Sequence, residues 1–120
     1  MSSNKPLEKT SYESRFIWVD CLPIMDQGEN AVSINEVLVD APVTVASPAL
    51  TATAPIVNTA SVLINGRSCL PGQAIGFRCA GGASNGQAGQ LYYVRLHFTS
   101  TIDPAREATV PIFVQDYPPV

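Results

Sequence analysis

The feature that most constrains the fold is a strict two-residue alternation of apolar and polar side chains in the last third of the chain. It runs through residues 91–99 and again through residues 107–115, with Asp103 and Pro104 in the loop between them. Because successive side chains of a strand point to opposite faces of a sheet, each segment predicts a strand with one buried face and one wet face. The buried rows are Tyr92, Val94, Leu96 and Phe98 in the first strand and Ala108, Val110, Ile112 and Val114 in the second.

Shorter apolar segments, separated by glycine, proline and asparagine, predict further strands upstream. Between residues 41 and 54, Pro42 and Pro48 each remove a backbone donor, so we expect edge-strand pieces and loop there. The expected strands span residues 15–20, 31–40, 56–64 and 73–79, with turns at residues 21–28 and at Asn65-Gly66.

About seven short strands and no segment with helical periodicity predict an all-β domain. At a length of 120 residues, the expected architecture is two packed antiparallel sheets in an immunoglobulin-like sandwich. We expect the sandwich over residues 14–117, after an extended arm of residues 1–13 and before a tail of residues 118–120. The arm is either a disordered terminus or a strap on a neighbouring subunit, and the sequence leaves both open.

Three cysteines, Cys21, Cys69 and Cys79, have neither the even count of a disulfide scaffold nor the spacing of a zinc site. We expect buried thiols, although Cys69 and Cys79 could face each other across a hairpin. The net charge of −3 and the scattering of the seven basic residues argue against direct nucleic-acid binding. No signal peptide and no membrane-spanning apolar segment is recognisable, so we expect synthesis in a cytoplasm without export.

No constellation of residues predicts chemistry. His97 is the single histidine and lies on the polar face of its strand, where a surface histidine is the simplest interpretation. Asp20, Asp26 and Glu29 do not follow a calcium-loop pattern, and we expect them to be solvated turn residues. The glycine-rich segment 80–90 lacks the phosphate-binding motifs and is expected to be an exposed connection or contact loop. We therefore expect no catalytic residue, no metal and no cofactor, and a protein that is not an enzyme.

The order of features in the chain matches that of a known family. An aromatic strand that ends in aspartate comes first, and a Gly-Glu turn and a second strand follow it. The chain then continues with a strand that ends in Gly-Gly, a tyrosine-bearing strand, a turn and a final strand. This order resembles the small immunoglobulin-like proteins of tailed bacteriophages, the fibre–tail adaptor and head–tail region proteins. The matching segments are residues 16–20, 26–30, 32–39, 77–82, 92–99, 103–107 and 108–114. The chain departs from the family in its longer glycine-rich linker and in having Asp-Pro-Ala-Arg where the family has a Gly-Arg turn.

The resemblance implies a structural protein of the virion, at the collar or tail. It implies contacts with portal, connector, tail or fibre subunits and a homo-oligomeric ring, without nucleic acid or membrane. A head decoration protein is the alternative within that class. A bacterial carbohydrate-binding or adhesin module is the alternative from another class, and it would need an exposed aromatic platform, for which Trp18, Tyr93, Phe113 and Tyr117 are the candidates.

Three regions are candidates for partner contacts: the arm, the glycine-rich loop and the polar face of the strand over residues 91–99. Each is equally well explained as solvated surface. The candidate contact residues are Lys5, Pro6, Leu7, Tyr12, Gly81, Gly82, Asn85, Gly86, Gly89, Tyr93, Arg95 and His97.

Overall fold

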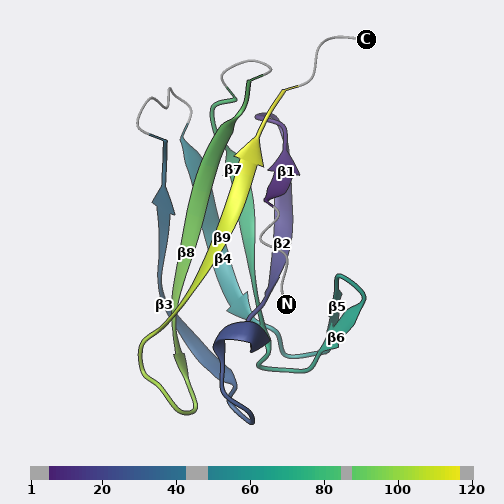
Figure 1. Cartoon of the computed structure of the whole chain (residues 1–120), viewed down its shortest axis with the longest axis vertical. Helices are drawn as coiled ribbons and strands as arrows, with labels where there is room; N and C mark the ends of the chain where they lie inside the picture. Colours follow the sequence, from purple (N-terminus) through teal and green to yellow (C-terminus); the bar gives the residue numbers. More distant parts are fainter. Residues whose placement is uncertain (1–5, 43–48, 85–87, 117–120) are drawn as a thin grey trace.

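The computed structural model describes residues 6–42, 49–84 and 88–116, and within these ranges two sheets pack face to face as a sandwich (Figure 1). One sheet has the strand order β1-β9-β8-β3 and the other β2-β7-β4, and β5 and β6 form a separate hairpin. The predicted all-β sandwich is therefore confirmed. The strands are β1 (Leu7–Lys9), β2 (Ser14–Asp20), β3 (Ala31–Asp40), β4 (Leu50–Val57), β5 (Val62–Ile64), β6 (Arg67–Cys69), β7 (Ala74–Gly81), β8 (Gln90–Ser100) and β9 (Arg106–Val114), with a short 3₁₀ turn η1 (Leu22–Ile24).

The C-terminal hairpin of β8 and β9 supplies the centre of the core, as its alternation predicts. The two strands pair antiparallel from Gln90 opposite Val114 to Phe98 opposite Arg106. The apolar row of β8 is completely buried and packs with Ile75 and Phe77 of β7 in one cluster. The predicted strands 15–20, 31–40 and 73–79 correspond to β2, β3 and β7.

The predicted strand over residues 56–64 is wrong, because the chain turns at Asn58. The buried side chain of Asn58 donates to the carbonyls of Ala60, Cys69 and Leu70 over 2.9–3.3 Å. Its Oδ1 accepts from the backbone N–H groups of Gly72 and Ala74 at 3.0 Å. These five bonds end β4 and bring the chain round to β7. The β5–β6 hairpin leaves the sandwich between these two points.

The edge-strand pieces expected with loop over residues 41–54 are confirmed in part, because residues 50–54 belong to strand β4. This strand lies at the edge of its sheet, and its pairing with β7 shifts register between Thr53 and Ile56, around Pro55. A proline is tolerated there because an edge or bulged position needs no ladder donor. Residues 43–48 of the expected loop lie outside the described residues.

Part of the expected arm of residues 1–13 belongs to the sandwich, because residues 7–9 form strand β1 of the four-stranded sheet. Strand β1 pairs in parallel with β9, and Leu7 packs against the core. Lys9 is buried, and its Nζ donates to the carbonyls of Thr10 and Gly81, each at 2.6 Å. Residues 7–9 are thus an edge strand of the four-stranded sheet, since the outer edge of β9 offers backbone groups that need partners.

All three cysteines are buried free thiols, as expected. Burial raises the pKa of the Cys21 thiol to about 12, and it also raises the pKa of Cys79. Cys69 lies on β6 and Cys79 on β7, so the two do not face each other across one hairpin.

Candidate functional site

The outer face of the four-stranded sheet carries the predicted polar row of β8. Tyr93 is 42% exposed there. Arg95 binds Asp40 of β3 with two guanidinium nitrogens, at 2.7 and 3.0 Å, and its Nη1 lies 3.9 Å from Oε1 of Glu107 on β9. The sequence therefore placed Tyr93 and Arg95 on the correct face, but the register with β3 and β9 supplied the partners of the arginine.

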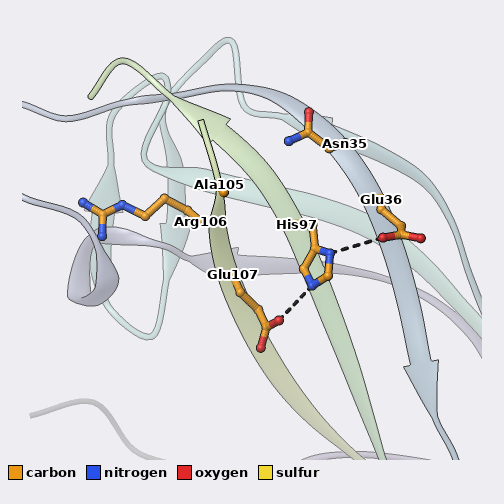
Figure 2. Close-up of a pocket in the computed structure, with 6 residues that line it drawn as sticks. All are labelled: Asn35, Glu36, His97, Ala105, Arg106 and Glu107. Carbon is orange, nitrogen blue, oxygen red and sulfur yellow. Dashed lines mark hydrogen bonds and ion pairs between the residues drawn. The ribbon is translucent and has the colours of Figure 1, made fainter. Parts of the chain in front are cut away.

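His97 lies at the centre of this face, between two carboxylates (Figure 2). Its Nε2 is 2.8 Å from Oε1 of Glu107, and its Nδ1 is 3.3 Å from Oε1 of Glu36. A shallow cleft of about 470 Å³ surrounds the ring, and its walls are formed by Asn35, Glu36, His97, Ala105, Arg106 and Glu107. In Figure 2 the guanidinium of Arg106 points away from the imidazole, whereas the carboxylates of Glu36 and Glu107 contact it.

Arg106 points instead to Glu29, and this pair corrects the expectation that Glu29 is a solvated turn residue. The carboxylate of Glu29 is fully buried and accepts from Nε and Nη2 of Arg106, each at 2.9 Å. The hydroxyl of Ser100 and the backbone N–H of Asp26 also donate to it. The bonds from Arg106, followed by those from Ser100 and Asp26, outweigh burial and lower the pKa of Glu29 to about 2.

Of the three acids that cluster in the sequence, Asp26 and Glu29 lie together beside Arg106, whereas Asp20 pairs with another arginine. Asp20 pairs with Arg67, Glu29 pairs with Arg106, and Asp26 remains largely exposed at 3.4 Å from Arg106. Within residues 6–42, 49–84 and 88–116, no group of three histidine, cysteine, aspartate or glutamate side chains is arranged to hold a metal ion.

The outer face of the three-stranded sheet carries a pair of aromatic side chains. Phe16 and Trp18 of β2 meet edge to face, with ring centroids 5.2 Å apart. They lie over Gly76 of β7, where an added Cβ would come within 2.5 Å of the Phe16 ring and 2.8 Å of the Trp18 ring. The guanidinium of Arg78 lies 5.8 Å from the centre of the Phe16 ring. Trp18, a predicted platform residue, is thus on this face, whereas Tyr93 is on the opposite sheet.

The β5–β6 hairpin is a candidate surface that the sequence interpretation missed. Figure 1 shows it beside the sandwich, apart from the two sheets. Leu63 is 73% exposed and Leu70, just after β6, is 55% exposed. The ion pair between Arg67 and Asp20 ties the hairpin to β2. The turn dipeptide Asn65-Gly66 is the signal in the sequence for this hairpin. The strand that follows the turn has only three residues, so it was not recognised as a strand.

The arm and the glycine-rich loop, two of the three predicted contact regions, meet at one end of the sandwich. Asp116, just after β9, accepts from the backbone N–H and hydroxyl of Ser11 and from the hydroxyl of Ser84. The bond from the Ser11 N–H and then those from the two hydroxyls lower the pKa of Asp116. This carboxylate therefore joins the segment after β1 to the start of the glycine-rich loop.

The individual contact candidates in these two regions have different environments. Tyr12 is 96% exposed, whereas Pro6 is half-buried and Leu7 packs against the core. The expectation of an exposed glycine-rich loop is wrong at its start. Gly81 belongs to β7, Gly82 is buried against Val114 and Leu50, and Gly89 lies against the ring of Phe113. Lys5, Asn85, Gly86 and the platform candidate Tyr117 lie outside the described residues.

No family model, no curated protein and no solved structure matches the chain. Among the described residues, no helix combines the length and the apolar character needed to cross a membrane.

Proposed function

We propose that the chain is a non-enzymatic structural component of a tailed-bacteriophage virion, an immunoglobulin-like adaptor that links tail or connector to fibres through protein contacts. The observation that supports a role in protein contacts is the β5–β6 hairpin, at which Leu63 and Leu70 are exposed. The assignment to a phage particle rests on the order of sequence features described above.

The strand order supports the immunoglobulin-like part of the proposal. If β2, β3, β4, β7, β8 and β9 are lettered B to G in chain order, the sheets pair as B-E-D and C-F-G. Immunoglobulin-like sandwiches pair these strands in the same way. β1 then adds a short strand beside the last one.

Tyr92 supports the same conclusion. It lies near the start of β8, and its hydroxyl accepts from the backbone N–H of Ala83 at 2.8 Å, across the preceding loop. Immunoglobulin-like domains place a tyrosine near the start of strand F and bond it back to the upstream backbone in this way. Two residues later, where antibody domains have their second cysteine, this chain has the buried Val94.

A contact role for the hairpin follows from the cost of exposing leucine. Apolar surface in water is unfavourable by about 25 cal/mol per Å², so burying both leucines against a partner favours association. The five bonds of Asn58 and the ion pair between Arg67 and Asp20 fix the hairpin in place. A hairpin that is already ordered loses little conformational entropy when it binds.

The second candidate function is a carbohydrate-binding or adhesin module, and the aromatic pair Phe16 and Trp18 favours it. Sugars stack their apolar faces on aromatic rings, and Arg78 lies beside this pair. A glycan array separates the two functions. Binding that a Trp18→Ala variant loses would support the carbohydrate module, and an array without binding counts against it.

Mass spectrometry of purified particles tests the phage proposal directly. Particles produced from the genome that encodes this chain should contain it in several copies, and separated tails should retain it. Recovery with the heads alone would favour the alternative of a head decoration protein. Absence from particles that contain their other structural proteins would contradict both.

A further inference from the structure

His97 contacts one carboxylate with each of its ring nitrogens, and the two carboxylates belong to different strands. Glu107 of β9 is 2.8 Å from Nε2 and Glu36 of β3 is 3.3 Å from Nδ1 (Figure 2). A carboxylate can only accept a hydrogen bond, and a neutral imidazole carries a single N–H. Only a protonated ring can donate to both partners at once.

We infer that His97 is a pH-dependent clasp that holds β3, β8 and β9 together on their outer face. With the proton bound, the ring donates to Glu107 and to Glu36. When the proton leaves, one nitrogen keeps its N–H and the other presents a lone pair to a carboxylate. That second contact then becomes repulsive, and its carboxylate moves away from the ring.

The other charged groups on this face identify Glu36 as the carboxylate that is released. Glu107 has the shorter contact with the ring, and it also faces Arg95 of β8 at 3.9 Å. Arg95 in turn is bound by Asp40 of β3. Arg106 of β9 is directed to Glu29 and Asp26 rather than to the ring. For Glu36, His97 is the only ion-pair partner within 4 Å in the part of the chain that the structure describes.

The backbone at Glu36 is suited to such a movement. β3 is an edge strand, and its pairing with β8 shifts register between Ile34 and Glu36. A register shift interrupts the ladder locally and leaves a residue unpaired. The side chain of Glu36 is 58% exposed and forms a wall of the cleft around the ring. Release of Glu36 therefore changes that wall without disturbing the buried row of β8.

Double-mutant cycles at two pH values test the clasp. Urea unfolding of the whole chain, of His97→Gln, of Glu36→Gln and of the double variant gives the coupling between the two side chains. Histidine changes charge between about pH 5 and 8, so measurements at about pH 5.5 and about pH 8 bracket the change. We expect the coupling to alter the folding equilibrium constant about threefold at the lower pH and to vanish at the higher. The coupling of His97 with Glu107 should persist at both.

The Arg95–Asp40 pair is the matched control, because it lies on the same face and neither residue type titrates between these pH values. A cycle of Arg95→Gln with Asp40→Asn should give the same coupling at both. Nitrogen NMR of the imidazole gives a second measurement on the unaltered chain, with two ring N–H groups expected at the lower pH and one at the higher. Equal His97–Glu36 coupling at both pH values, no coupling at the lower pH, or a ring with one N–H at the lower pH would overturn the clasp.

Discussion

At the scale of single residues, Glu29 is a buried carboxylate that is surrounded by hydrogen-bond donors. Its buried carboxylate accepts from Arg106, Ser100 and the backbone of Asp26, and so it joins the turn before β3 to the ends of β8 and β9. An amide at this position would remove the charge that pairs with the partly buried guanidinium of Arg106. We expect Glu29→Gln to lower the melting temperature, whereas Asp26→Asn, in the largely exposed neighbour, should leave it almost unchanged.

The same carboxylate predicts how stability depends on pH. Its pKa is about 2 in the folded chain, against an ordinary value of 4.5, so the charged form favours folding. The contribution of Glu29 is fully present above about pH 4.5 and is lost as the pH falls towards 2. The melting temperature of the unaltered chain should fall over this window, and that of Glu29→Gln should fall less. Parallel curves for the two proteins would contradict the assignment.

Gly81 provides a test of backbone strain. Its φ is +74°, and an added Cβ would lie 2.6 Å from the carbonyl oxygen of Ala49, a backbone atom that cannot move aside easily. Gly28 has a φ of +80° but nothing within 4 Å of its added Cβ. Gly81→Ala should lower the free energy of unfolding by about 3 kcal/mol and Gly28→Ala by about 1 kcal/mol. Urea unfolding measures both, and equal losses would show that the close contact has no effect.

At the scale of elements, Asn58 decides where β4 ends and where the β5–β6 hairpin begins. Replacement by alanine leaves the N–H groups of Gly72 and Ala74 and three carbonyls without this partner. Each unsatisfied buried group costs about 1–3 kcal/mol. We expect Asn58→Ala to lower the free energy of unfolding by about 3 kcal/mol, while Thr59→Ala, on the exposed neighbour, should change it by no more than about 0.5 kcal/mol. A small effect of Asn58→Ala would mean that water replaces the lost bonds.

The elements also show what the sequence could predict. The rows of β8 and β9 were recognisable because period-two alternation is a local signal that one buried face imposes. Four of the five bonds of Asn58 reach 11 to 16 residues along the chain, and the pairing of Leu7 with Ile112 joins distant parts of it. Such contacts follow from tertiary structure and leave no pattern in the nearby residues. The β5–β6 hairpin and β1 were therefore missed.

In the candidate site, too, the local pattern was recognisable and the long-range partners were not. Alternation placed Tyr93, Arg95 and His97 on the wet face, where the structure also has them. Their partners Glu36, Asp40 and Glu107 come from neighbouring strands, so only the register reveals them. Glu29 looked like a turn residue because its partner Arg106 is 77 positions away.

At the scale of the whole molecule, the surfaces of the sandwich differ in character. The outer face of the four-stranded sheet is crossed by ion pairs within the chain, and that of the three-stranded sheet carries the pair of Phe16 and Trp18. The β5–β6 hairpin exposes leucines on a fixed support. This division between internally paired charge and exposed apolar side chains is the physical basis for proposing a contact protein.

Photo-cross-linking through residue 63 tests whether the β5–β6 hairpin contacts a partner. A photoreactive phenylalanine analogue replaces Leu63 in the chain while particles assemble, and a matched chain carries the analogue at the exposed Gln27 of the turn before β3. After irradiation, mass spectrometry of the purified particles identifies what each position has captured. We expect residue 63 to capture a second virion protein or another copy of the chain, and residue 27 to capture neither. Equal capture at the two positions, or none at residue 63, would contradict this expectation.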